Sequence, residues 1–182
     1  AGELVASMEK GGGGLRERFS SSLSGQGARG EGVVDAVEVA LTSLMVDRAD
    51  SAAERVTAGW AALPPGRARL DRAVGGERAS ADLRTRAGRL VEQWRASVTE
   101  RARAAAPADS AARIEDGATA ALLTEVLVLE SSDPERHSGV GRGVLDAVFG
   151  RERVTSLVRA AHDDLVDRVT SLFEAEQSRF GT

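Results

Sequence analysis

The residues best suited to chemistry are two histidines and the carboxylates beside the second of them. His162 is followed by Asp163, Asp164 and Asp167, whereas His137 lies far away in the sequence. Imidazole and carboxylate groups can together bind a divalent cation. Neither histidine has a glutamate three residues before it, so the Glu-x-x-His pattern of di-iron helical bundles is missing. We therefore interpret the aspartates as a solvated acidic helix face and predict no metal site.

The sequence also lacks the motifs of nucleotide and acyl chemistry. A P-loop needs G-x-x-x-x-G-K-[ST], because the backbone amides, the lysine and the hydroxyl each have a separate task on the nucleotide. The only lysine, Lys10, instead precedes the glycines 11–14. The run GVGRG at 139–143 lacks the third glycine of a dinucleotide-binding loop and follows no predicted strand. No G-x-S-x-G nucleophile motif occurs, so we predict no catalytic and no cofactor-binding residue.

Composition indicates a helical protein without a general affinity for nucleic acid. The chain has 182 residues, enough for one domain with a real core, and Ala, Val, Leu, Arg, Asp and Glu dominate it. Its net charge is −4 and its pI about 5.3, which argues against nucleic-acid binding. No apolar run reaches the length of about 20 residues that spans a bilayer. Because the chain begins at Ala1 without an initiator Met, we expect it to be part of a longer protein.

One segment departs from the acidic average. From Arg67 to Arg103 there are ten arginines and five acidic residues. We interpret this excess as a solvated helix face that is balanced by acidic neighbouring helices. The alternative is a patch that faces phosphate or lipid.

The clearest periodic signal lies in residues 151–180. Apolar residues recur there at steps of three, four or a multiple, which places them on one helix face: Val154, Val158, Ala161, Leu165, Val169, Leu172 and Phe180. Their period is closer to 3.6 than to 3.5, which fits a globular bundle better than a two-stranded coiled coil. At 1.5 Å per residue this helix would be roughly 45 Å long and would need partner helices along its length.

Three more helical regions are expected to supply those partners. The first, at about 31–63, has these residues at steps of three or four: Val34, Val37, Leu41, Leu44, Arg48, Ala52, Val56, Gly59 and Leu63. Pro64-Pro65-Gly66 should end it, and a short helix at 67–74 could follow. The second, at about 80–106, has this line: Leu83, Ala87, Leu90, Val91, Trp94, Val98 and Ala102. The third lies at 110–129.

These patterns predict an all-α protein, an elongated bundle of about four helices with long antiparallel helices. The bundle should cover residues 31–182, with its last helical region at 144–180 broken or kinked at Gly150 and the glycines 139, 141 and 143 keeping the preceding stretch loose. Residues 1–30 should form a short helix, a Gly-rich hinge and a flexible loop. We predict these core anchors: Trp60, Trp94, Leu165 and Leu172.

Three segments carry a family resemblance. They are residues 33–63 with the Pro-Pro-Gly elbow, the run Leu90-Val91-Glu92-Gln93-Trp94, and VLDAVFG at 144–150 with the helix that follows it to Phe180. Together they cover about two thirds of the chain and resemble the region C-terminal to the GTPase domain in actinobacterial dynamin-like proteins. Such proteins often carry a long apolar membrane hairpin at the place where this chain has residues 107–143, which are too polar and too short to span a bilayer.

The resemblance implies a non-catalytic helical stalk or neck, which couples the nucleotide state of a GTPase domain to self-assembly and membrane remodelling. The implied partner is a second copy or a sister dynamin-like subunit, and nucleic acid is not among the partners. The implied location is the cytoplasm, with any peripheral membrane contact at the inner face of the cell membrane. The alternative is a self-contained helical protein–protein interaction adaptor unrelated to GTPases. A third hypothesis is an enzyme whose site is built from the scattered carboxylates.

Overall fold

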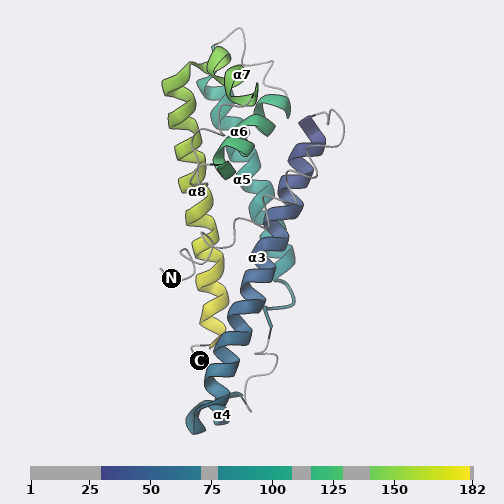
Figure 1. The fold of residues 1–182 in the computed structure, drawn as a ribbon, viewed down its shortest axis with the longest axis vertical. Coiled ribbons are helices and arrows are strands. Elements are labelled where there is room, and N and C mark those ends of the chain that lie inside the picture. Colours follow the sequence, from purple (N-terminus) through teal and green to yellow (C-terminus); the bar gives the residue numbers. More distant parts are fainter. Residues whose placement is uncertain (1–29, 71–77, 108–115, 129–139, 181–182) are drawn as a thin grey trace.

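A computed structural model describes residues 30–70, 78–107, 116–128 and 140–180 of the chain. Within these ranges the regular secondary structure is helical throughout and contains no strand. Three long helices, α3 (Gly30–Ala61), α5 (Leu83–Ala105) and α8 (Arg151–Gln177), follow the long axis of the molecule (Figure 1). The shorter elements are α4 (Pro64–Leu70), α6 (Asp116–Val128), α7 (Val140–Phe149) and the 3-10 helix η3 (Ser178–Phe180). The prediction of an all-α protein is confirmed.

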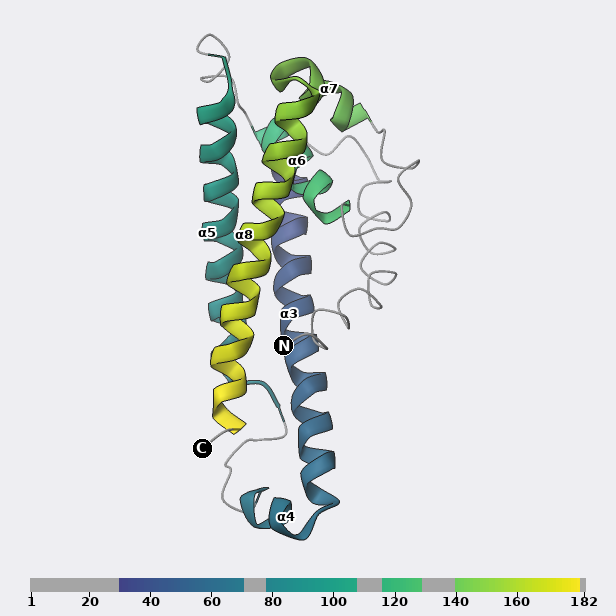
Figure 2. The same cartoon turned by 90° about the vertical axis from the view of Figure 1, so that its left-hand side faces the viewer.

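Contacts between side chains fix the directions of α3 and α5. Near the start of α3, Glu38 forms an ion pair with Arg95 of α5 at 2.7 Å. Further along α3, Asp50 accepts a hydrogen bond of 2.8 Å from the backbone N–H of Ala79, just before α5 begins. The two helices therefore run in opposite directions, as Figure 2 also shows.

Helix α8 packs against the other side of α5, again in the opposite direction. The start of α8 reaches the end of α5, where Arg153 donates to the carbonyl of Ala105 at 3.1 Å. The far end of α8 reaches the start of α5, where Ser80 contacts Glu176. Helix α6 packs against α3, α5 and α8, so a fourth helix covers the half of the molecule in which α8 begins (Figure 2).

The buried faces of α5 and α8 follow the apolar lines predicted from the sequence, except that Leu90 and Phe180 are only half-buried. On α5 the buried residues are Leu83, Ala87, Val91, Trp94, Val98 and Ala102. On α8 they are Val154, Val158, Ala161, Leu165, Val169, Leu172 and Glu176. Trp94, Leu165 and Leu172 are thus confirmed as core residues, and Trp94 is fully buried. The burial of Glu176 on α8 was not predicted from the sequence.

The predicted core line of α3 is correct at the start of the helix and wrong beyond it. Val34, Val37 and Leu41 are buried as expected. The buried residues that follow are Met45, Ala49 and Ala53, each one position after the predicted Leu44, Arg48 and Ala52. Steps of four advance the buried face by about 40° per step around a helix with 3.6 residues per turn. The buried face therefore rotates around α3, and the predicted line leaves it by stepping three residues from Leu41 to Leu44 instead of four.

Trp60 does not belong to the buried core, so its prediction as a core anchor is wrong. It is half-buried near the end of α3, and its ring meets the edge of Phe180, with centroids 6.0 Å apart. This contact still joins α3 to the segment after α8. Leu63, which was predicted to continue the buried line, is 58% exposed because α3 ends at Ala61.

The Pro-Pro-Gly elbow ends one helix and begins the next. We expected a short helix at 67–74, but α4 already starts at Pro64 and ends at Leu70. Proline is well suited to the first turn of a helix, where its missing N–H has no intrahelical partner to lose. Gly66 is buried, and a Cβ at this position would collide with the backbone of Trp60. A glycine at the third position therefore allows α4 to fold back closely on the end of α3.

The predicted loose stretch before the last helix is partly wrong. Helix α7 begins at Val140, so glycines 141 and 143 lie inside a helix. The predicted break at Gly150 is confirmed, since this residue has φ +81° between α7 and α8. Helix α6 occupies 116–128 of the region predicted at 110–129. The predictions for residues 1–29, 71–74, 110–115, 129 and 139 lie outside the described ranges.

Candidate functional site

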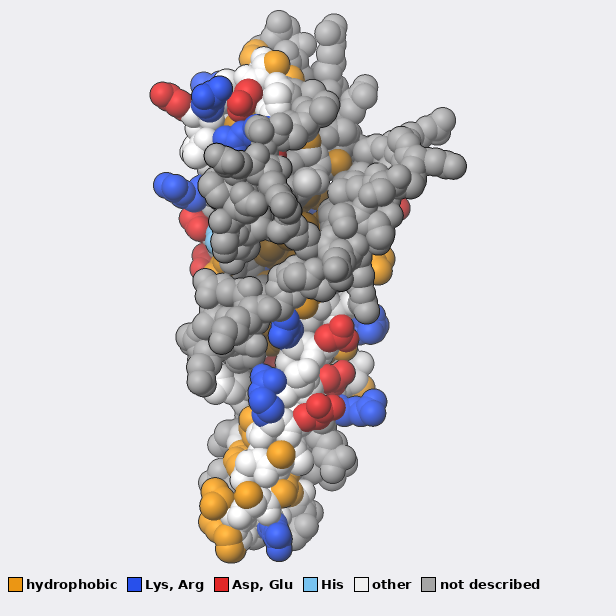
Figure 3. All heavy atoms as spheres, in the orientation of Figure 1, with side chains coloured by type: hydrophobic (Ala, Val, Ile, Leu, Met, Phe, Trp, Pro, Cys, Tyr) orange, Lys and Arg blue, Asp and Glu red, His pale blue; other side chains and the backbone are white. Residues whose placement is uncertain are grey.

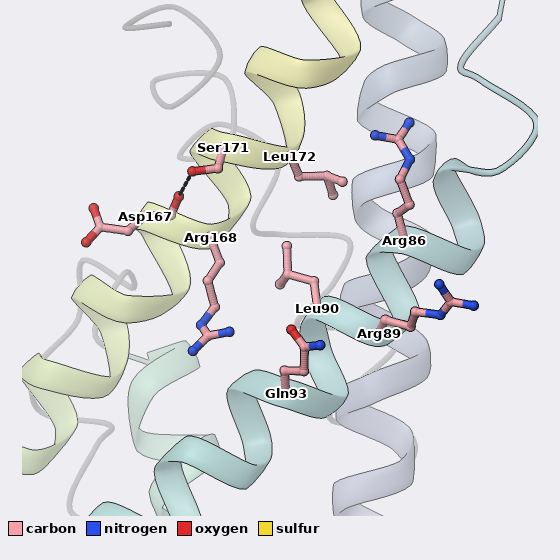
Figure 4. Close-up of a pocket in the computed structure, with 8 residues that line it drawn as sticks. All are labelled: Arg86, Arg89, Leu90, Gln93, Asp167, Arg168, Ser171 and Leu172. Atoms are coloured by element: carbon pink, nitrogen blue, oxygen red, sulfur yellow. Dashed lines mark hydrogen bonds between the residues drawn. The ribbon is translucent and has the colours of Figure 1, made fainter.

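The histidine and aspartates near the middle of α8 point in different directions. The Nδ1 atom of His162 lies 3.4 Å from an oxygen of Asp163, an exposed residue, whereas Asp164 is turned toward α5. Asp167 points away from α5 (Figure 4). Across the described part of the chain no three His, Cys, Asp or Glu residues form a group that could hold a metal ion. His137 lies outside that part.

Asp164 is instead a structural hub between α8 and α5. It accepts a hydrogen bond of 2.7 Å from the hydroxyl of Ser97 and one of 2.9 Å from Arg168, and Arg101 lies 3.4 Å away. Burial acts to raise the pKa of this carboxyl, but Ser97, Arg168 and Arg101 outweigh burial and hold the pKa below its ordinary value. Asp164 therefore remains an acceptor and does not act as a proton donor near neutral pH.

A second carboxylate, Glu176, closes the opposite end of the α5–α8 pair. Its side chain is buried and accepts hydrogen bonds from both Ser80 and two arginines. The backbone N–H and the hydroxyl of Ser80 each donate at 2.6 Å, Arg86 donates at 2.7 Å, and Arg179 adds a further bond. We call Ser80, Arg86, Glu176 and Arg179 the Glu176 clasp. It ties the residues before α5 to the last turn of α8.

The clasp keeps Glu176 ionised. Burial acts to raise the pKa of the Glu176 carboxyl, whereas hydrogen bonds from Ser80, Arg86 and Arg179 lower it and prevail, so that the pKa is below its ordinary value. The pKa of Arg86 is raised, because its bonds to Glu176 and Asp82 outweigh the effect of burial. Glu176 and Arg86 therefore both stay charged. The clasp stabilises the packing of α5 and α8 and does not transfer a proton.

A third polar cluster joins three helices at the other end of the molecule. Arg142 of α7 contacts Glu125 of α6 at 3.0 Å, the hydroxyl of Thr155 of α8 at 3.1 Å, and Asp146 at 3.5 Å. One guanidinium thus bridges α6, α7 and α8. The described part of the glycine-rich run, residues 140–143, lies in α7 and carries the bridging Arg142.

An open groove lies between α5 and α8, with a volume of about 480 Å³. Its lining residues come from both helices: Arg86, Arg89, Leu90 and Gln93 of α5, and Asp167, Arg168, Ser171 and Leu172 of α8. Leu90 and Leu172 converge in its middle, while Arg89 extends outward along one side (Figure 4). Arg86 and Arg168 are ion-paired with Glu176 and Asp164, so among the described residues Arg89 supplies the unpaired positive charge of the groove.

The arginines of α5 divide into paired and unpaired groups. Arg86, Arg95 and Arg101 form ion pairs with carboxylates of α8 or α3. Among the residues that the structure describes, Arg84, Arg89 and Arg103 have no acidic partner within 4.0 Å, and all three are exposed. The interpretation of the basic excess as balanced by neighbouring helices therefore holds for half of these arginines.

Sequence reasoning missed the Glu176 clasp, although a signal for it was present. Glu176 lies four residues after Leu172, which is the next step of the buried line on α8. A charged residue at such a position is expected to be buried only if partners reach it. Those partners are Ser80 and Arg86, which lie 96 and 90 residues earlier, and no pattern in the sequence around Glu176 predicts them.

Comparisons of the chain with protein-family models, with curated proteins and with solved structures found no match. None of the described helices is both long and apolar enough to cross a bilayer. The candidate functional features of the described residues are the α5–α8 groove and the ion-pair clusters.

Proposed function

We propose that this chain is the non-catalytic helical stalk of a dynamin-like GTPase, which couples the nucleotide state to self-assembly and membrane remodelling. We further propose that α3, α5, α6 and α8 act as one elongated four-helix bundle. The observation that carries the proposal is the set of three long helices packed along one axis. At 1.5 Å per residue they measure about 48, 35 and 40 Å.

The ion-pair clusters support a mechanical role. The Glu176 clasp joins α5 to α8 at one end, the Arg142 bridge joins α6, α7 and α8 at the other, and Asp164 lies between them. Such connections resist sliding of one helix along another, because sliding would leave the buried Glu176 and the half-buried Asp164 and Arg142 without partners. A displacement applied at one end of α8 would then move the whole unit.

The sequence of the complete reading frame tests the connection to a GTPase. The proposal expects a G-x-x-x-x-G-K-[ST] loop upstream of this chain, in a region that forms a nucleotide-binding domain. A complete frame without such a loop would overturn the stalk proposal and leave the helical adaptor as the better account.

We propose that any membrane contact of this stalk is made by its apolar tip, which comprises Ala62, Leu63, Pro64 and Pro65. All four are exposed, and hydrophobic side chains gather at this end of the molecule (Figure 3). Helix α4 contains two arginines and no acidic residue, so the tip combines apolar and cationic groups. Anionic lipid surfaces attract that combination, at about 1 kcal/mol per basic residue.

Flotation with vesicles of phosphatidylserine and phosphatidylcholine tests the tip. We expect the chain to float with anionic vesicles and Leu63→Asp to lose most of that binding. Ala147→Asp is the matched control, because Ala147 is also exposed but lies on α7, at the opposite end of the molecule from the tip. Equal losses in both variants, or no flotation of the unmodified chain, would contradict this proposal.

A further inference from the structure

We propose that the basic α5–α8 groove binds the outer face of α3 from a second copy of this chain, so that copies associate head to tail. This inference deepens the self-assembly part of the proposed function by naming the two surfaces. The groove offers the half-buried Leu90 beside the buried Leu172 in its middle, and the exposed Arg89 at its side. The matching surface must therefore present one apolar side chain with a carboxylate nearby.

The outer face of α3 has that chemistry. Val39 is 67% exposed and is one of only two large hydrophobic residues strongly exposed in the described ranges. Asp35 lies four residues earlier, which is about one helical turn and places it beside Val39. Asp35 is exposed, and neither it nor the exposed Asp47 has a cationic partner among the described residues. Both carboxylates are available to an arginine from outside.

The charges of the two helices are complementary. Helix α3 contains six acidic residues and two arginines, a formal charge of −4. Helix α5 contains six arginines and two glutamates, a formal charge of +4. Within one molecule the Glu38–Arg95 pair uses part of this complementarity. Asp35 and Arg89 remain for contact between copies, and complementary charges of this kind select the partner and its orientation.

The positions of the two surfaces imply an open chain of copies. On α5, Arg95 faces α3, whereas Ser97 faces α8 and marks the side on which the groove lies. Val39 points away from the core face of α3, which includes Val37 and Leu41. The groove and the Val39 face therefore lie on different sides of the molecule, and one copy can use both at once. Such a heterologous contact extends into a filament unless its rotation closes a ring.

Sedimentation velocity over a range of concentrations tests the inference with charge reversals. We expect the average mass of the unmodified chain to rise with concentration, and to rise less at high salt because exposed charges are screened. Arg89→Glu and Asp35→Arg should each weaken the association about tenfold, since each replaces an attraction across the contact with a repulsion. An equimolar mixture of the two variants should associate again. The glutamate introduced at position 89 of one variant can then form an ion pair with the arginine introduced at position 35 of the other.

Arg84→Glu is the matched control, since Arg84 is an exposed arginine of α5 outside the groove. It should leave the association unchanged, and circular dichroism should show that all variants keep their helices. A chain that stays monomeric, equal effects of Arg84→Glu and Arg89→Glu, or no recovery in the mixture would overturn the inference. A GTPase reading frame with a monomeric chain would overturn this inference alone, whereas association without such a frame would overturn only the link to a GTPase.

Discussion

At the scale of single residues, Trp94 provides the most specific contact between α5 and α8. Its ring is fully buried, and its Nε1–H donates to the carbonyl of Ala161 at 2.8 Å. Trp94→Phe keeps an aromatic ring but removes this donor, so the free energy of unfolding should fall by about 1–2 kcal/mol in urea titration. Trp60→Phe is the control at a half-buried position and should cost less. Equal losses would contradict the assignment of Trp94 as the anchor of this pair.

Glu176 should make the stability of the protein depend on pH in the acid range. Because its pKa is lower in the folded protein than in the unfolded chain, its contribution is fully present above the ordinary glutamate pKa. That contribution is lost as the pH falls through the ordinary value toward the lowered one. Glu176→Gln should therefore destabilise the protein at pH 7, by about 2 kcal/mol, and reduce the loss of stability on acidification.

Thermal unfolding of both proteins between pH 7 and pH 3 measures this effect. Glu174→Gln is a suitable control, because Glu174 is exposed on the same helix and has no part in the clasp. If the acid dependence of the Glu176→Gln variant matched that of the unmodified chain, Glu176 would not be the group responsible.

At the scale of elements, Gly150 sets the angle between α7 and α8. Its backbone, at φ +81° and ψ 144°, lies in a region that L-residues rarely adopt. A Cβ there would meet nothing within 4 Å, so the cost of Gly150→Ala is conformational rather than steric. We expect a loss of about 1–3 kcal/mol.

The same substitution at Gly143, Gly143→Ala, is expected to raise the stability of the protein. Gly143 is exposed within α7 and also has free space around it. Alanine is favoured over glycine in a helix by about 1 kcal/mol, so this variant should be more stable. Chemical denaturation of the two variants side by side would measure the difference, and a stabilising Gly150→Ala would show that α7 and α8 do not need this backbone conformation.

Periodicity predicted the elements best where a helix packs along its whole length. The buried lines of α5 and α8 follow from the sequence because each helix buries a single line of mostly apolar residues along its whole length. The line of α3 does not, since its buried face rotates from Val37 toward Ala53 as its neighbours change. Pairings across long sequence separations, such as Ser80 with Glu176, and the groove between two helices depend on tertiary packing that single-sequence patterns do not contain.

At the scale of the whole molecule, a stalk that transmits motion requires the long helices to move as one rigid body. The chain contains no cysteine, so two introduced cysteines can be spin-labelled without background. Ala62→Cys at the tip and Arg151→Cys at the start of α8 are both exposed and lie toward opposite ends of the molecule (Figure 1). A second labelled pair within α8, Arg151→Cys with Gln177→Cys, gives the width of the distance distribution expected for a single rigid helix.

Double electron–electron resonance between the tip and the start of α8 is the most direct test of this claim. We predict one distance with a width close to that of the pair within α8. Two distances, or a distribution much broader than the reference, would show that α3 and α8 move independently, and a stalk that transmits motion along its length would then be contradicted.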